Sequence, residues 1–261
     1  MKDLKETCKL AVVQAAPVMF QRQSCVEKAL DLIAKAAEMG AELIVFPELF
    51  IPGYPYGMTY GFTVGHREEA GRQDWKAYYD NSIVVPGEET DRLAQAAKQH
   101  GVYVSIGVSE RDGMTGTLYN TNLVFTPDGR LDAVHRKLKP TGAERVVWGD
   151  ADRNFFPVTD SPWGPIGSMI CWESYMPLAR VALYQKGRDP LHSPPIPMIT
   201  KSGRAPSAIL RWRDDATLST ATCTSPGTCT PKISLLWSIS TSWMKWFAAA
   251  EAVSLTPMAT M

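Results

Sequence analysis

The fold is decided by residues 9–46, which read KLAVVQAAPVMFQRQSCVEKALDLIAKAAEMGAELIVF. Lys9–Gln14 and Leu43–Phe46 are short apolar runs with β-branched residues, the composition of buried strands. From Cys25 to Met39, apolar residues recur every three to four positions, which predicts a helix that buries one face, and Ser24 is its candidate N-cap. A strand, a crossover helix and a second strand predict two parallel neighbours in one sheet.

Helices and strands continue to alternate up to Gly187. Helices are predicted around Asp74–Tyr79 and at Glu89–His100 and Pro177–Lys186, and strands at Val102–Val108, Asn120–Phe125, Arg130–His135 and Ile166–Ile170. Pro127-Asp128-Gly129 between two of these strands is a strong hairpin signal. The pattern therefore predicts an α/β fold whose sheets mix parallel and antiparallel strands.

Charge and cysteine usage exclude several classes of function. The formal net charge is +0, so no global field attracts nucleic acid or an acidic membrane, and neither is an expected partner. Five cysteines at irregular spacing form no CxxC pair, which argues against a zinc site and favours free thiols in a reducing cytoplasm. The apolar run Leu10–Val13 follows lysines like a signal peptide, but it is short and Gln14 interrupts it, so export is not expected.

The character of the chain changes after Gly187. From Arg188 to Met261, Ser, Thr and Pro fill more than a third of the positions, and neither strand nor helix periodicity runs for long. Only Ile233–Trp237 and Met244–Val253 qualify as elements. One interpretation is a flexible low-complexity tail. The other is that the segment did not evolve with this fold, as after a shift of reading frame, which translation of the coding DNA in the other frames would test.

Cys171 is the first candidate for chemistry. It follows the predicted strand Ile166–Ile170 and precedes a helix, so its thiol would lie exposed at a sheet edge. The backbone N–H of Trp172 could then stabilise a negative charge that develops on a substrate. The alternative is a buried, inert cysteine that behaves as a small apolar residue.

Two further charged residues also end predicted strands. Glu48 closes Ile44-Val45-Phe46-Pro47-Glu48 and is either a solvated strand end or a base in a cleft. Lys137 ends a hairpin strand and is either a surface cation in a basic run or an electrostatic partner of such a site. Glu144 follows closely and could pair with Lys137 or with Arg145.

Three segments together resemble a known family. Phe46-Pro47-Glu48, His135-Arg136-Lys137 and Ile170-Cys171-Trp172-Glu173 are similar, in order and separation, to the signature blocks of the nitrilase branch of the carbon–nitrogen hydrolase superfamily. Further matches are Gln14-Ala15-Ala16-Pro17, Ile51-Pro52-Gly53-Tyr54-Pro55, Lys139-Pro140-Thr141, Glu144-Arg145 and Trp148-Gly149. The resemblance covers about residues 8–187, and Tyr175-Met176-Pro177-Leu178 after the cysteine resembles true nitrilases, including fungal ones.

The resemblance implies roles for these residues. Cys171 would be the nucleophile, Glu48 the general base and Lys137 the stabiliser of charged intermediates, with Glu144 as a second, positioning glutamate. Tyr54 would line the substrate pocket or pack in the core. The implied reaction converts a small-molecule nitrile and water to a carboxylic acid and ammonia without a metal or organic cofactor. Cyanide hydratase or amidase activity and a catalytically inactive relative stay open as alternatives.

The resemblance also implies an architecture. Members of the family form a four-layer α-β-β-α sandwich and assemble as homo-oligomers. Residues 1–187 would be the hydrolase domain, incomplete because the family's later strands and helices have no counterpart after it. Residues 188–261 would be a Ser/Thr/Pro-rich tail that does not match the family.

Overall fold

The computed structural model describes Lys5, residues 7–66, 68–153 and 155–186, and the backbone of four strands beyond them. The strands are β1 (Thr7–Gln14), β2 (Leu43–Val45), β3 (Ile83–Val84), β4 (Tyr103–Arg111), β5 (Leu118–Phe125), β6 (Leu131–Arg136), β7 (Val158–Thr159), β8 (Ile166–Ile170), β9 (Met198–Ser202), β10 (Ser207–Arg211), β11 (Thr217–Ser219) and β12 (Lys232–Ser240). The helices are α1 (Arg22–Glu38), α2 (Glu69–Asn81), α3 (Glu88–His100) and α4 (Pro177–Lys186), with 3-10 turns η1 (Gly142–Val146) and η2 (Cys171–Tyr175). None of the described helices combines the length and the apolar character needed to cross a membrane.

The first sheet has seven strands in the order β12-β1-β2-β4-β5-β6, and β3 pairs with β4. Strands β1, β2 and β4 run parallel, with Leu10 opposite Leu43 and Leu43 opposite Tyr103. Strands β4, β5 and β6 are antiparallel neighbours. The predicted parallel pair, the predicted hairpin and the mixed sheet are therefore confirmed.

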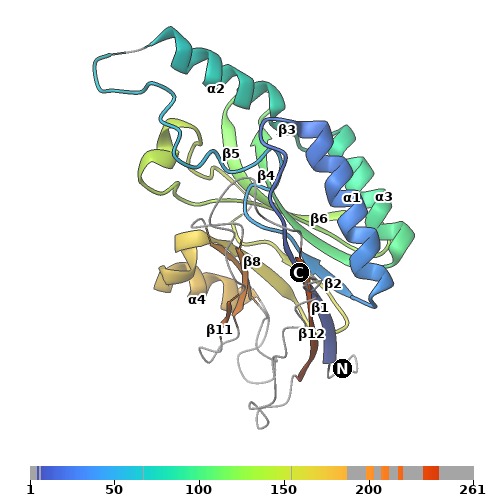
Figure 1. Cartoon of the computed structure of the whole chain (residues 1–261). Coiled ribbons are helices and arrows are strands. Elements are labelled where there is room, and N and C mark those ends of the chain that lie inside the picture. Colours follow the sequence, from blue (N-terminus) through green and yellow to red (C-terminus); the bar gives the residue numbers. More distant parts are fainter. Residues whose placement is uncertain are drawn as a thin grey trace, which may run out of the picture.

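Each face of the first sheet buries a different layer. Residues such as Ala11, Val13 and Ile44 alternate toward α1 and α3, which lie side by side on the outer face (Figure 1). Their neighbours Leu10 and Val12 point the other way, into a cluster that includes Trp163 and Ile166. Burial of apolar surface on both faces is what makes these strands continuous apolar runs in the sequence.

The second sheet completes the sandwich. Its five strands follow the order β11-β10-β9-β8-β7, and β8 is buried along its whole length. Ile166 of β8 faces the first sheet, whereas Met169 packs against Ala179 and Leu183 of α4. Helices therefore cover the outer face of each sheet, and the predicted four-layer α-β-β-α arrangement is confirmed (Figure 1).

The predicted start of the first helix was wrong. Helix α1 begins at Arg22, and Ser24 lies inside it, where its Oγ donates to Gln21 Oε1 at 3.1 Å instead of capping the backbone. The Arg22 N–H donates to Asn81 Oδ1 at 3.0 Å. A side chain at the end of α2 thus satisfies one of the donors that a local cap would have satisfied, so the helix can start earlier.

The expectation for the segment after Gly187 was only partly right. Ile233–Trp237 lies in β12, which pairs antiparallel with β1, so this predicted element is confirmed. Strands β9, β10 and β11 were not predicted, because three to five residues with polar side chains show no readable period. Met244–Val253 lies outside the described residues.

A close backbone contact positions the loop that carries Glu48. After β2 the chain crosses β4, where Gly107 N–H donates to Pro47 O at 3.3 Å and Gly107 O accepts from Ile51 N–H at 3.3 Å. A Cβ on Gly107 would lie 2.5 Å from the Leu49 nitrogen and 2.8 Å from the Glu48 Cα. Glycine is therefore required there for the loop to lie on the sheet.

We expect Gly107→Ala to lower the free energy of unfolding by about 1–3 kcal/mol, because the added methyl group forces the loop off the sheet. Chemical denaturation measures this change. Gly113→Ala is the matched control, since its nearest neighbour would be Val84 Cγ1 at 3.8 Å. Equal stability of the two variants would contradict the packing argument.

Candidate active site

Three of the predicted residues follow strand ends of the two sheets. Glu48 follows β2 after two residues, Lys137 directly follows β6, and Cys171 directly follows β8. The Lys137 side chain is 1% exposed, so its interpretation as a surface cation was wrong. Glu48 is also buried, which excludes a solvated strand end.

The Lys137 ammonium lies between two buried carboxylates. Its Nζ donates to Glu48 Oε1 at 3.1 Å and to Glu144 Oε2 at 2.7 Å. Of the two partners predicted for Glu144, the structure therefore pairs it with Lys137. Asn120 Nδ2 donates to Glu48 Oε1 at 2.7 Å, while Glu48 Oε2 is buried without a hydrogen-bond partner among the described residues. One carboxylate oxygen of Glu48 is thus held, and the other is open to accept a proton.

Burial sets the electrostatics of this group. It raises the pKa of Glu48 above the ordinary value, an effect that the nearby Lys137 charge opposes only in part. Burial alone would lower the pKa of Lys137, but the charges of Glu48 and Glu144 outweigh it, and the pKa is raised. The lysine therefore stays cationic, while Glu48 is poised to exchange a proton.

Cys171 completes the group. It is half-buried and has a φ of 56°, in the left-handed region that a residue with a side chain seldom adopts. Its Sγ, one oxygen of Glu48 and one of Glu144 all lie within 4.8 Å of one another. The structure thus brings thiol, carboxylate and ammonium together as the sequence predicted. The three donor atoms could also hold a metal ion, but the Lys137 ammonium already supplies a positive charge to both carboxylates.

Glu144 is held from three sides. It lies in η1, where its Oε2 accepts from Thr141 N–H at 2.8 Å in addition to Lys137. Its Oε1 accepts from the Tyr54 hydroxyl at 2.8 Å. Burial, followed by the charge of Glu144, raises the pKa of Tyr54, so this hydroxyl remains a donor. Tyr54 also packs against Trp148, with ring centroids 6.0 Å apart, and its contacts here are those of a residue that supports Glu144.

The Trp172 side chain lies at the surface. It is 56% exposed and lies beside Tyr175, with ring centroids 5.0 Å apart. The residue directly follows Cys171 in η2, the position from which its N–H was predicted to act.

Two residues of the site were not predicted from the sequence. Asn120 is buried on β5 and fixes Glu48, and the only signal for it was a polar residue within a buried strand. Glu173 is fully buried, and its carboxylate accepts from Ile170 N–H at 2.6 Å. A glutamate three residues after a strand end is the spacing of a capping box, which could have indicated this contact.

The family model for carbon-nitrogen hydrolases matches residues 9–206. The chain belongs to this family. It is 53% identical to an aliphatic nitrilase of Sinorhizobium fredii (strain HH103) over 177 residues, which are 68% of this chain and 56% of that protein. It is 46% identical to a bifunctional nitrilase/nitrile hydratase of Nicotiana tabacum over 181 residues, 69% of this chain and 51% of that protein. The chain thus spans about half the length of these relatives and lies in the nitrilase branch of the family.

Solved structures of the nitrilase superfamily share the fold. An amidase of this superfamily from Nesterenkonia AN1 gives a TM-score of 0.63 at 15% identity, covering 90% of this chain and 92% of the amidase. Nit3 of Saccharomyces cerevisiae gives a TM-score of 0.64 at 18% identity, covering 85% of this chain and 89% of Nit3. At these identities the comparison supports the fold alone.

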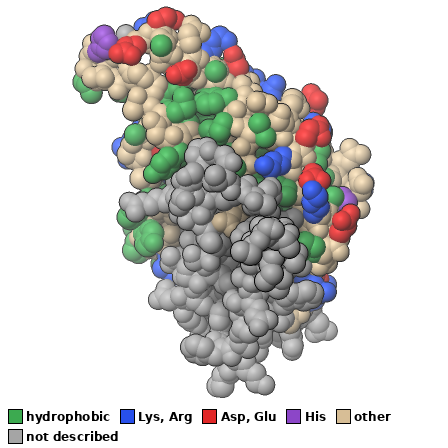
Figure 2. All heavy atoms as spheres, viewed as in Figure 1, with side chains coloured by type: hydrophobic (Ala, Val, Ile, Leu, Met, Phe, Trp, Pro, Cys, Tyr) green, Lys and Arg blue, Asp and Glu red, His purple; other side chains and the backbone are tan. Residues whose placement is uncertain are grey.

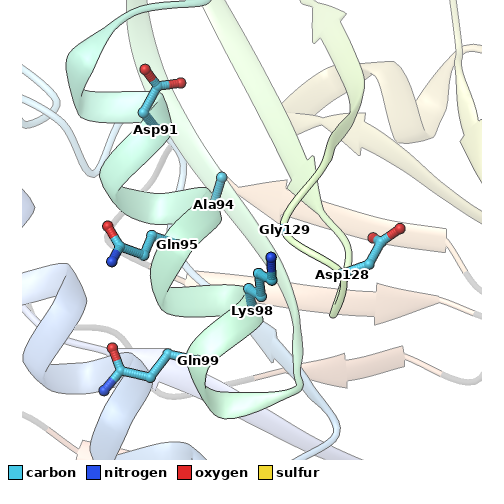
Figure 3. A pocket seen from close by; sticks show the side chains of 7 residues that line it. All are labelled: Asp91, Ala94, Gln95, Lys98, Gln99, Asp128 and Gly129. Carbon is cyan, nitrogen blue, oxygen red and sulfur yellow. The ribbon is translucent and has the colours of Figure 1, made fainter.

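On the surface of the residues that the structure describes, one depression lies apart from the group around Lys137. In the coloured part of Figure 2, acidic and basic side chains are mixed, as expected for a formal net charge of +0. A shallow depression lies between α3 and the β5–β6 turn (Figure 3). It is lined by Asp91, Ala94, Gln95, Lys98, Gln99, Asp128 and Gly129, none of which belongs to the group around Lys137.

We expect Lys137→Met to lower the free energy of unfolding by about 3–5 kcal/mol at neutral pH, because it leaves two carboxylates buried without their cation. The deficit should shrink as the pH falls, since protonation of Glu48 removes one buried charge. Urea unfolding at several pH values measures both effects. Lys139→Met is the control: its ion pair with Asp150 is exposed and stabilises by about 0–1 kcal/mol at most. A deficit independent of pH would contradict the explanation.

Proposed function

We propose that this chain acts on nitriles, which it hydrolyses to a carboxylic acid and ammonia through a covalent cysteine intermediate. The observation that carries the proposal is the convergence of Cys171 Sγ with oxygens of Glu48 and Glu144 within 4.8 Å, around the ammonium of Lys137. The identity of 53% to an aliphatic nitrilase supports nitriles as the substrate class. Cys171, Glu48 and Lys137 are the proposed catalytic residues, and Glu144 and Tyr54 position them.

The first half of the reaction forms a thioimidate. Glu48 takes the thiol proton of Cys171, and the sulfur attacks the nitrile carbon, so that a C–S bond forms and one C–N π bond breaks. The negative charge moves to the nitrogen, where the Lys137 ammonium and the Trp172 N–H stabilise it. The proton held by Glu48 then passes to that nitrogen.

The second half releases the products. Glu48 accepts a proton from a water molecule, whose oxygen adds to the thioimidate carbon to give a tetrahedral intermediate. The nitrogen takes up that proton to become an amino group. Glu48 then transfers the proton of the new hydroxyl group to the same nitrogen, the C–N bond breaks as the C=O bond forms, ammonia leaves, and a thioester remains. A second water hydrolyses the thioester to the acid and restores the thiol. Two water molecules are consumed for each nitrile.

An amide product is the alternative outcome at the same site. If the C–S bond of the tetrahedral intermediate breaks in place of the C–N bond, the amide leaves after one water has been consumed. This is the reaction of a hydratase, and the tobacco relative is described as a bifunctional nitrilase/nitrile hydratase. An amidase reaction would use the same residues from the thioester onward. The ratio of amide to acid separates these reactions.

An inactive relative is the alternative from another class. The chain matches 56% of the aliphatic nitrilase and 51% of the tobacco relative, so the rest of those proteins has no matched counterpart here. We infer that residues 1–187 form the hydrolase domain and that most of residues 188–261 were not selected with it, although the family match extends to residue 206. On that view the chain would act at most as a partner of a full-length homologue.

Assembly and location follow from the same proposal. The reaction needs a reduced Cys171 thiol, which supports a reducing compartment such as the cytoplasm.

An apolar patch on η2 and α4 is exposed at Trp172, Tyr175 and Leu178. Such a patch supports contact with a second copy of the chain. A homo-oligomer is therefore the expected form.

We expect purified protein to release ammonia from an aliphatic or aromatic nitrile and Cys171→Ala to lower kcat by about 10⁴-fold or more, because the nucleophile is lost. Ammonia is measured by a coupled assay, and the acid and amide by chromatography. Cys8→Ala is the control, since this half-buried cysteine lies on β1 away from the group. No turnover of any nitrile or amide by folded protein would favour the inactive relative.

The pH dependence should report Glu48. A base must be unprotonated, so kcat/KM should fall as the pH drops through the pKa of Glu48, which burial raises above the ordinary value of about 4.3. The hydrogen bond from Asn120 lowers this pKa, so Asn120→Ala should move the acidic midpoint to higher pH. A pH–rate profile of both proteins measures the shift. An unchanged midpoint would argue against Glu48 as the base.

A further inference from the structure

A third buried glutamate lies beside the group without belonging to it. Glu173 is in η2, two residues after Cys171, and its side chain is 0% exposed. Its Oε1 accepts from Leu138 N–H at 2.6 Å, and its Oε2 accepts from Ile170 N–H at 2.6 Å. His135 Nε2 lies 2.8 Å from the same Oε2. One carboxylate therefore has three nitrogen neighbours from two separate parts of the chain.

These neighbours flank the nucleophile and the lysine. Ile170 is the residue before Cys171, at the end of β8 in the second sheet. Leu138 is the residue after Lys137, beyond the end of β6 in the first sheet. Glu173 thus connects the two strand ends that carry the thiol and the ammonium, across the interface between the sheets.

Both oxygens of Glu173 act as acceptors in this contact, because both backbone N–H groups can only donate. When Glu173 is ionised, it also accepts from His135 Nε2, and that nitrogen then carries the proton. His135 is itself fully buried and stacks on Phe156, with ring centroids 5.0 Å apart. Its ring therefore holds Glu173 Oε2 in place. Three charge-assisted hydrogen bonds to one buried group make a rigid connection.

We propose that Glu173 is a positioning residue, which sets the separation between the Lys137 ammonium and the Cys171 thiol by holding Leu138 and Ile170 on one carboxylate. Its carboxylate accepts from the backbone N–H groups of Leu138 and Ile170, so it acts through the backbone. The expected effect of Glu173 on hydrolysis rests on the proposed function. The expected effect of Glu173 on the reactivity of the Cys171 thiol does not depend on that function.

A neutral amide cannot replace this carboxylate. In Glu173→Gln one oxygen becomes an NH₂ group, which would face either the Leu138 N–H or the Ile170 N–H, and two donors repel each other. One of the two strand ends is then released. Among the residues whose side chains the structure describes, Lys137, Glu48, Glu144 and Tyr54 are charged or titratable groups near Cys171. A thiol farther from Lys137 loses a cation that favours the thiolate, so it should react more slowly at neutral pH.

The test measures alkylation of Cys171 by iodoacetamide as a function of pH, with the modified peptide quantified by mass spectrometry. Cys25, which is buried behind the first sheet, is the reference thiol within the same chain. We expect Glu173→Gln to lower the rate at Cys171 about tenfold at neutral pH and to move its pH profile upward by about one unit. A folded variant with the rate and profile of the unmodified protein would overturn the proposal.

Glu89→Gln is the matched control. Glu89 is also a buried glutamate, paired with Arg22 at 3.0 Å, but it lies on α3 at the outer face of the first sheet. Glu89→Gln should lower the stability of the protein without a change in the pH profile of Cys171 alkylation. A shift in both variants would mean that loss of any buried carboxylate loosens the site, and it would also overturn the proposal.

The hydrolase assay is run on the same proteins. Where nitriles are turned over, Glu173→Gln should lower kcat at least about tenfold while KM changes by less than about threefold, because the reacting groups and not the substrate contacts are displaced. Where no nitrile is turned over and the alkylation profile still shifts, the proposed function fails and the positioning role stands.

Two further measurements test the proposal if Glu173→Gln does not fold. Glu173→Asp keeps the charge but is one methylene shorter, so it cannot reach both N–H groups, and its profile should shift in the same direction. In the unmodified protein, amide hydrogen exchange at Ile170 and Leu138 should be slow at both positions. Fast exchange at either amide would show that the connection is not maintained and would overturn the proposal.

Discussion

The site depends on one electrostatic constraint, a lysine ammonium buried between two carboxylates. Separately, each of these charges would be unstable inside the protein, because removal from water is unfavourable for every ion. Together the three charges stabilise one another, because Lys137 Nζ donates hydrogen bonds to Glu48 Oε1 at 3.1 Å and to Glu144 Oε2 at 2.7 Å. The same arrangement that makes the group tolerable in the interior also leaves Glu48 Oε2 without a hydrogen-bond partner among the described residues, in a carboxylate that lies within 4.8 Å of the Cys171 thiol. Stability and reactivity therefore have a common origin here.

The two sheets bring these groups together because each charged side chain follows a different strand end. Glu48 depends on the close contact of its loop with Gly107, and Glu144 depends on the turn that begins at Thr141. Cys171 sits in a left-handed backbone conformation at the end of β8. Backbone constraints, more than side-chain packing, decide where each reactive atom lies. Membership of the carbon-nitrogen hydrolase family accounts for the presence of all these constraints in one chain.

Short-range patterns in the sequence predicted most of the fold and the core of the site. Up to Lys186, periodicity and turn residues located the α-helices and every strand except the two-residue β3 and β7, and strand ends followed by Glu, Lys and Cys predicted the group around Lys137. The start of α1 could not be predicted, because the N–H of its first residue, Arg22, donates to the side chain of Asn81, which lies far away in the sequence. Asn120 was missed for the same reason, because nothing near it in sequence reveals that it faces Glu48. Strands as short as β11 carry too few residues to show a period.

The pairing of β12 with β1 has a consequence for the order in which the chain can fold. Val13 lies opposite Ile233, so β1 can find this neighbour only after the chain has been made as far as β12. Until then one edge of β1 offers unpaired backbone groups to any other extended chain. Closing so long a loop is entropically unfavourable and delays the pairing further. During synthesis, therefore, the nascent protein passes through a prolonged stage in which self-association competes with completion of the sheet.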